Sequence, residues 1–209
     1  MIIKDGIPYI AVLIILCLFF YFLHPVLALI PAGLLLFVVF FFRNPPRQIP
    51  ENDQHILSPA DGKIMEIKEI KDTVFFGGKV TKITIFLSVF NVHVNRAPIK
   101  GKITHTEYRP GKFLPAFKGH ASDVNERNTI GIENEHLKVM VHQITGFIAR
   151  RIVFYHKKGD FLSQGSIFGM IKFGSCTEIV IPAHVKTVAQ KGQKVKAGIS
   201  VLGVLRNEQ

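Results

Sequence analysis

A glycine–serine pair between two apolar runs is the stretch of this chain best suited to chemistry. Ile167–Phe173 and Ile179–Ile181 flank Gly174-Ser175-Cys176. Alternation and β-branched residues predict a strand for each run, so the pair should lie in a tight turn. Glycine leaves its carbonyl unshielded there, and the serine hydroxyl can attack that carbonyl once a base removes its proton. An isolated Gly-Ser pair is more often an ordinary turn, so other residues must decide.

A serine nucleophile needs a base and a group that orients the base. His93 alternates with Asn91 and Asn95, which places the three side chains on one face of a strand. Asp61 lies in a Pro-Ala-Asp-Gly stretch, where aspartate commonly caps its own backbone turn. Taken alone, a strand histidine and a turn aspartate are more often structural than catalytic.

Longer stretches change this balance. Phe168-Gly-Met-Ile-Lys-Phe-Gly-Ser175 resembles the self-cleavage segment of phosphatidylserine decarboxylase proenzymes in their short form. Three further stretches agree with that family in order and spacing, and together they cover nearly the whole chain after about Pro50: Leu57–Lys63, Ser88–Pro98, and Asn125–Asn128 followed by Ile148–Ile152.

The resemblance implies a role for each candidate. The family's aspartate and histidine match Asp61 and His93, so a triad-like Ser175–His93–Asp61 arrangement is expected, with Asp61 orienting the imidazole. Ser175 would attack the Gly174 carbonyl and separate a 1–174 chain from a 175–209 chain. The cofactor would be a covalent pyruvoyl group derived from Ser175. It would form a Schiff base with the substrate amine and act as an electron sink, converting phosphatidylserine to phosphatidylethanolamine and CO₂.

Four arginines are candidates for contact with the lipid substrate, although surface solvation is the usual state of such residues. Longer family members carry His-x-x-His in the strand of His93, and Arg96 occupies the second place here. One histidine would therefore serve both cleavage and later proton transfer, or Arg96 would bind the lipid phosphate or carboxylate. Arg127, Arg150 and Arg151 lie in the family-like stretches.

The sequence offers little for metal chemistry or for disulfides. The remaining histidines lack the spacing of metal ligands, and neither a His-Glu-x-x-His motif nor a glycine-rich phosphate loop occurs. The two cysteines, Cys17 and Cys176, indicate no disulfide framework and fit a reducing compartment.

A rival interpretation is a non-enzymatic, membrane-anchored carrier or adaptor. Ser58–Ile67 and Val188–Gly198 resemble the two halves of lipoyl or biotinyl carrier domains. A carrier should present a modifiable lysine in a Met-Lys-Met or Asp-Lys-Ala tip, and the sequence has neither. A decarboxylase of another serine-headed lipid remains a third alternative.

Residues 1–42 predict a hydrophobic membrane hairpin. Apolar residues dominate from Ile7 to Phe42, and His24-Pro25 splits the run into arms at Pro8–Leu23 and Val26–Phe42. One crossing needs about 20 apolar residues, so partial insertion of these short arms is an alternative, as is a buried helix pair. Basic residues at both ends favour a cytoplasmic catalytic domain at the cell membrane. The net charge of +11 favours anionic partners, and the apolar segment favours lipid over nucleic acid.

The rest of the chain predicts an α+β fold with a β-rich, sandwich- or barrel-like catalytic domain at residues 51–209, after a proline-rich linker at residues 43–50. A helix is expected over Thr145–Tyr155 and a loop over Phe113–Asn128. Strands are expected at Lys63–Lys71, Lys79–Val89, His93–Asn95, Lys102–Tyr108, Thr129–Glu133, Leu137–Ile144, and in pieces over Lys194–Leu205.

Overall fold

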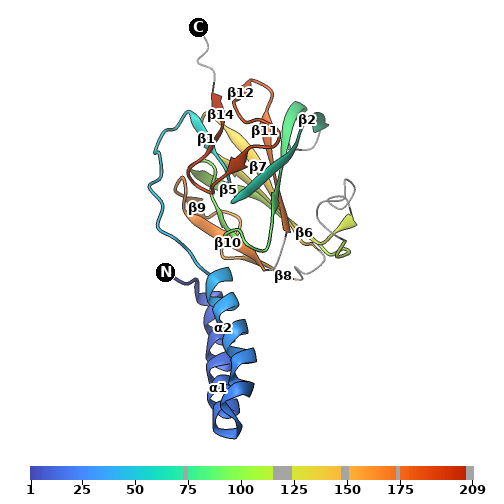
Figure 1. The fold of residues 1–209 in the computed structure, drawn as a ribbon. Coiled ribbons are helices and arrows are strands. Elements are labelled where there is room, and N and C mark those ends of the chain that lie inside the picture. The colour runs from blue at the N-terminus through green and yellow to red at the C-terminus, as the bar shows by residue number, and fades with distance from the viewer. Residues whose placement is uncertain (73–74, 115–123, 147–150, 173–174, 206–209) are drawn as a thin grey trace. The chain divides into compact units, whose positions relative to one another are not determined.

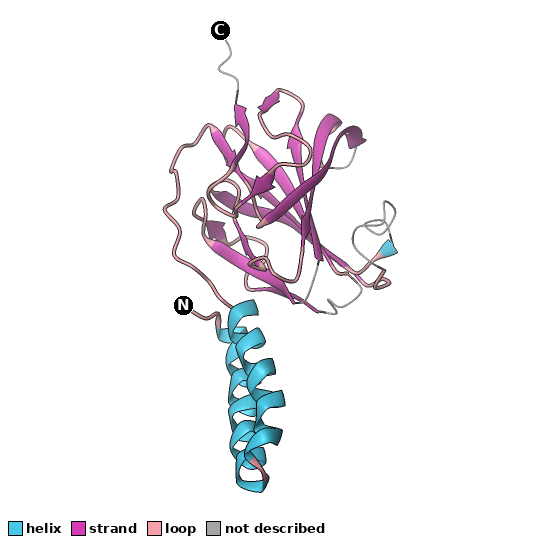
Figure 2. Ribbon diagram, in the orientation of Figure 1, coloured by secondary structure: helices cyan, strands magenta, loops and turns pink. Residues whose placement is uncertain are grey.

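A computed structural model describes residues 1–72, 75–114, 124–146, 151–172 and 175–205. The chain forms two compact units, Met1–Pro46 and Arg47–Gln209. The first is helical and the second consists of antiparallel strands (Figures 1 and 2). This arrangement confirms the predicted α+β class and its β-rich second part.

The helical unit contains α1 (Ile7–Leu23) and α2 (Leu29–Phe41), with short 3-10 helices at Lys4–Gly6 and Pro25–Ala28. Helix α1 ends just before His24-Pro25, as predicted. Pro25 lacks an amide hydrogen and starts the next short helix, where no amide donor is needed. No residue of α1 is buried, although all its residues are apolar or aromatic. By length and composition, Lys4–Leu23 is sufficient to cross a membrane, whereas Pro25–Phe41 is shorter.

The second unit is built on a curled eight-stranded antiparallel sheet with the order β13-β2-β3-β11-β7-β6-β5-β9. Its strands are β13 (Lys194–Val195), β2 (Gly62–Asp72), β3 (Gly78–Leu87), β11 (Ser175–Pro182), β7 (Lys138–Ile144), β6 (Arg127–Glu133), β5 (Gly101–Arg109) and β9 (Phe161–Leu162).

Two three-stranded sheets complete this unit. One has the order β4-β10-β8, formed by Val94–Arg96, Ile167–Lys172 and Arg151–Phe154. The other has the order β1-β14-β12, formed by His55–Leu57, Val201–Leu205 and Val185–Thr187.

Alternation along the strands places the main core on one face of the large sheet. Ile83, Ile179, Val141 and Ile130 lie side by side on β3, β11, β7 and β6, and all four are fully buried. Because side chains alternate between faces, their sequence neighbours must point to the opposite face. Part of that face is covered by Phe75, whose ring fits against Gly131, where a Cβ atom would lie 2.6 Å from the ring.

Two local predictions need correction. The helix expected over Thr145–Tyr155 is wrong for its described second half, because Arg151–Phe154 forms β8 and pairs with β10. The β-branched residues of that run suit a strand, and residues 147–150 lie outside the described residues. The loop expected over Phe113–Asn128 ends earlier, since β6 already begins at Arg127. The rest of that loop falls largely on residues 115–123, which are also outside the described residues.

The two carrier-like segments pair with each other. The Ile64 amide donates to the Gln193 carbonyl at 2.9 Å, and the Gly192 amide donates to the Ile64 carbonyl at 2.8 Å. The two similar segments therefore lie side by side at the edge of the large sheet where β13 pairs with β2.

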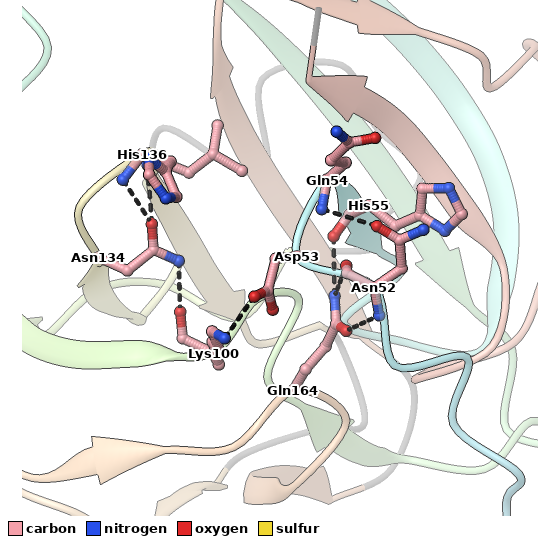
Figure 3. A network of polar contacts seen from close by, with 9 residues as sticks. Asn52, Asp53, Gln54, His55, Lys100, Asn134, His136 and Gln164 are labelled. Atoms are coloured by element: carbon pink, nitrogen blue, oxygen red, sulfur yellow. Dashed lines mark hydrogen bonds and ion pairs between the residues drawn. The ribbon is translucent and has the colours of Figure 1, made fainter. Parts of the chain in front are cut away.

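The segment that precedes β1 is fastened to the β unit by Gln164 (Figure 3). The Gln164 amide nitrogen donates to the His55 carbonyl at 2.8 Å, and its side-chain oxygen accepts from the Asn52 amide at 3.1 Å. Lys100 forms an ion pair with Asp53 beside this contact. These contacts hold residues 52–55 against Lys100 and Gln164, which are far from them in the sequence.

Candidate active site

Ser175 is the first residue of β11, which lies between β3 and β7 in the large sheet. It faces Leu87 of β3 and is fully buried. Its Oγ atom has no hydrogen-bond partner among the described residues. An unsatisfied buried hydroxyl costs free energy, so such an atom in a native structure calls for a specific reason.

The chain changes sheets immediately before Ser175. Strand β10 ends at Lys172 in the sheet with β4 and β8, and β11 begins at Ser175 in the large sheet. The intervening Phe173 and Gly174, and with them the tight turn predicted there, lie outside the described residues. The Gly174–Ser175 bond is therefore part of a two-residue connection between two sheets.

His93 is fully buried just before β4. Its Nδ1 atom lies 3.0 Å from the Asn91 carbonyl oxygen. Because a carbonyl oxygen can only accept, Nδ1 is the donor in this contact, which leaves Nε2 as the nitrogen that could act as a general base.

Contacts on both sides place His93 beside the connection that holds Ser175. The Ile171 amide donates to the His93 carbonyl at 3.2 Å, and Ile171 is the second-to-last residue of β10, which leads into that connection. On the other side, Leu87 pairs with Ser175, and a turn closed by Asn91 leads from Leu87 to His93. The segments that contain Ser175 and His93 are therefore neighbours in the structure.

Asp61 has different partners from those expected. Its carboxylate accepts from the Arg47 guanidinium at 2.9 and 3.1 Å and from the Ala197 amide at 2.8 Å. Within the described residues, none of its hydrogen bonds goes to His93, whose Nδ1 faces Asn91 instead. The orienting contact expected from the carboxylate is supplied in this conformation by a backbone carbonyl.

Arg96 joins Arg47 and Asp61 in one cluster of charges. Its guanidinium donates to the Gly165 carbonyl at 2.9 Å. Burial lowers the pKa of Arg96, the nearby Arg47 lowers it further, and Asp61 raises it. Arg96 is opposite Ile167, at the end of β10 away from Ser175.

The other arginine candidates lie in different surroundings. Arg151 is exposed and opposite Lys172, the last residue of β10 before residues 173–174. Arg127 lines a cavity of about 430 Å³ with Glu178 and His142, on the face of the large sheet opposite the main core. Arg150 lies outside the described residues. Arg151 is therefore the described arginine candidate that pairs with the end of β10 next to residues 173–174.

Comparison with known proteins identifies the family of this chain. The model of the family described as phosphatidylserine decarboxylase matches residues 34–203. The chain is 52% identical over 204 residues to a phosphatidylserine decarboxylase proenzyme of Carboxydothermus hydrogenoformans, covering 97% of this chain and 96% of the relative. The chain belongs to the phosphatidylserine decarboxylase family. Proenzymes of the same name from Symbiobacterium thermophilum (43% identical, 97% and 94% covered) and Chlorobium phaeobacteroides (46%, 87% and 85%) are also similar.

Membership of this carboxy-lyase family does not favour the carrier interpretation. The family match extends over both carrier-like segments, from residue 34 to residue 203. In the described part of the chain, no group of three or more His, Cys, Asp and Glu side chains could hold a metal ion.

Cys176 follows Ser175 directly but has different surroundings. It points to the opposite face of β11 and is buried. Burial raises the pKa of the Cys176 thiol well above its ordinary value, and Glu178 raises it further. Because the thiolate is the reactive form of cysteine, Cys176 is poorly suited to act as a nucleophile.

Sequence reasoning missed two residues of the site, Arg47 and Asn91. Arg47 belongs to a segment interpreted as a linker, and only the folded chain shows that it binds Asp61. Asn91 acts through its backbone carbonyl, for which side-chain patterns carry no signal.

Proposed function

We propose that this protein converts phosphatidylserine to phosphatidylethanolamine and CO₂ after cutting its own chain between Gly174 and Ser175. The observation that carries the proposal is the fully buried Ser175 hydroxyl, which has no partner among the described residues, beside the His93 segment. Family membership supports the same reaction and substrate.

Self-cleavage needs only groups of this chain and one water molecule. His93 removes the Ser175 hydroxyl proton, and Oγ attacks the Gly174 carbonyl carbon. The peptide C–N bond then breaks, the nitrogen gains a proton, and an ester replaces the amide. Loss of the Cα proton of residue 175 breaks its Cβ–O bond, which releases Gly174 as a carboxylate and leaves dehydroalanine. Water hydrolyses the imine form of that residue to a ketone and ammonia.

The surroundings of residue 175 fit the pyruvoyl group that this sequence of steps would leave. The group would stand at the buried first position of β11, between β3 and β7. When formed, it supplies an electron sink for loss of CO₂. His93 would hold and return the proton that the product requires. Arg151 would bind the lipid phosphate or carboxylate, because it is exposed at the end of β8 facing Lys172.

The two pieces would stay together as a heterodimer of residues 1–174 and 175–209. Strand β11 pairs with β3 and β7, and β14 pairs with β1, so strands on both sides of the cut share sheets. No covalent link is required to hold them, since buried strand pairing and core packing cross the cut.

The apolar helices would hold the protein at the cell membrane, with the catalytic unit on the cytoplasmic side. The exposed apolar surface of α1 supports attachment, and basic residues at both ends of the apolar segment support this orientation. A diacyl substrate already lies in that interface, so attachment removes the need to extract it.

The decisive experiment compares two Gly-Ser pairs in the full chain. Wild-type protein and Ser166→Ala should both yield two pieces, with the smaller piece of residues 175–209 blocked to Edman sequencing. Ser175→Ala should remain one chain. The Ser166 hydroxyl donates to the Ser163 carbonyl at 2.6 Å. Ser166→Ala therefore removes a serine hydroxyl from the other Gly-Ser pair and serves as the matched control. Persistent cleavage in Ser175→Ala would refute the assignment.

Variants of the base and its surroundings test the remaining roles. His93→Ala should slow cleavage by about 10²-fold or more, and added imidazole should restore part of the rate. Asp61→Asn should also slow it, through loss of the Arg47 ion pair. Wild-type rates in both variants would remove these residues from the mechanism.

Substrate assays then separate the lipid alternatives. Mature protein should release CO₂ from phosphatidylserine in mixed micelles. Faster release from another serine-headed lipid would show that this lipid, and not phosphatidylserine, is the preferred substrate. Arg151→Gln should raise KM with little change in kcat, whereas Arg127→Gln serves as the comparison on the opposite sheet face. Equal effects of the two changes would argue against Arg151 as a specific contact.

A further inference from the structure

Asn95 lies at the centre of a buried chain of polar side chains. Its Nδ2 donates to Thr177 Oγ1 and to the Pro59 carbonyl, each at 3.2 Å. Its Oδ1 accepts from Gln143 Nε2 at 2.9 Å, and Gln143 Oε1 accepts from Asn128 Nδ2 at 2.9 Å. Asn95, Thr177 and Gln143 are fully buried, and Asn128 is nearly so.

The Asn95–Thr177 bond connects two different sheets. Asn95 belongs to β4 in the sheet with β10 and β8, whereas Thr177 belongs to β11 in the large sheet. His93 precedes Asn95 by two residues, and Ser175 precedes Thr177 by two residues. Ser175 and Thr177 both lie on β11, where residues two apart point to the same face. The bond therefore joins β4, which begins one residue after the proposed base, to β11, which begins at the proposed nucleophile.

Cleavage changes what this bond connects. In the uncut chain, residues 173–174 also join the two sheets covalently. After a cut at residue 174, Asn95 belongs to the large piece and Thr177 to the small piece. The side-chain bond then crosses between the two chains, next to the new end of the small chain.

A gain in folding stability does not readily explain why these buried side chains are polar. Buried polar groups pay a desolvation cost, and apolar side chains of similar volume often stabilise a core equally well. What a satisfied buried network does provide is a unique arrangement of the elements it joins.

We propose that the Asn95–Thr177 hydrogen bond positions His93 against residue 175, both before and after cleavage. Asn95 and Thr177 are positioning residues, because neither provides the reacting atoms. The inference rests on the proposed self-cleavage at Ser175 and adds to it the element that aligns base and nucleophile. A small misplacement of reacting groups can cost about 10²-fold in rate, so loss of one aligning bond should be measurable.

The test uses Thr177→Val in the full-length protein, since valine keeps the shape of threonine and removes its hydroxyl. Asn95 retains its bonds to Pro59 and Gln143, which favours a folded variant. We expect cleavage to slow by about tenfold or more. Thr177→Ser keeps a hydroxyl and should restore most of the rate.

A matched control lies at the other end of the same network. Asn128→Leu removes the Asn128–Gln143 bond, also 2.9 Å and buried, without touching the link between the sheets. It should lower the unfolding temperature at least as much as Thr177→Val and leave the cleavage rate within about twofold, because the β4–β11 bond stays in place.

A chemical readout identifies the affected step. Hydroxylamine cuts esters under mild conditions and spares amides, so uncut Thr177→Val should resist it if the first attack by Ser175 is what slows. After cleavage has gone to completion, the same variant should show a lowered kcat for phosphatidylserine with KM little changed.

The outcomes separate this inference from the function on which it rests. Uncut wild-type protein would remove the proposed function itself. A wild-type protein that cleaves, with Thr177→Val cleaving equally fast, would overturn the positioning role alone. Equal slowing by Asn128→Leu would assign the effect to general stability, and a normal kcat in mature Thr177→Val would overturn the role after cleavage.

Discussion

Protonation of His142 should destabilise the folded protein in mildly acidic solution. His142 lies on β7 facing Glu178, on the side of the large sheet away from the main core. It is buried, and its Nδ1 lies 2.8 Å from Thr129 Oγ1. The pKa of His142 is lowered from 6.5 to about 3, mainly by burial and also by the charges of Arg127 and Lys82, against an opposing effect of Asp72.

The sign follows from which state binds the proton. Between pH 6.5 and pH 3 the unfolded chain is protonated at this histidine and the folded protein is not. Acid therefore favours unfolding, and stability rises with pH through this window. A depression of this size corresponds to about 5 kcal/mol when fully expressed, at 1.36 kcal/mol per unit. At pH 5 the same relation gives a loss of about 2 kcal/mol relative to neutral pH.

The assay measures urea unfolding in detergent micelles by circular dichroism at pH 7.5 and pH 5. A Ser175→Ala background keeps the protein as one chain, so unfolding does not release a fragment. His142→Gln in that background should lose about 2 kcal/mol less stability on acidification than its parent. His184→Gln, at an exposed position, is the matched histidine-to-glutamine comparison. If parent and His142→Gln respond alike to acid, His142 is charged in the folded protein and the reasoning fails.

Three further predictions concern attachment, reactivity and backbone packing. Protein that begins at Glu51 should leave the membrane fraction far more readily than the full chain; equal fractionation would show another principal anchor. In folded protein Cys176 should resist alkylation and react only after urea is added, as peptide mass spectrometry would show, because its thiol is buried and protonated. Gly169→Ala should lower the unfolding temperature, since its Cβ atom would lie 2.2 Å from the Val153 carbonyl oxygen, whereas Gly78→Ala meets nothing within 4 Å and should not.

The strands were predictable where alternation is long and regular. Lys63–Lys71 and Lys102–Tyr108 each fall within one observed strand, because their residue types leave no competing helical period. The run after Thr145 mixes apolar and basic residues at spacings that both periods can accommodate. Its pairing with β10, which sequence neighbours cannot reveal, decides for a strand.

The site was predictable to the extent that it depends on which residues are present. The candidate Gly-Ser pair and His93 are recognisable from the sequence, and their segments are neighbours in the structure. The partner of Asp61 was not predictable, since Arg47 reaches it from a segment that has no regular secondary structure. Long-range pairing of charged side chains depends on the path of the whole chain, which local patterns do not encode.

Because β11 lies in the middle of the large sheet, the proposed cut would make later unfolding of the molecule irreversible. The strand lies between β3 and β7, so it must have joined them while it was still covalently attached to the chain. After the cut, a denatured molecule would have to regain its middle strand from a separate peptide, and that encounter depends on concentration. Dilute mature enzyme should therefore not refold, although its uncut precursor can. Its lifetime is then set by how slowly it unfolds, whatever its equilibrium stability was before processing.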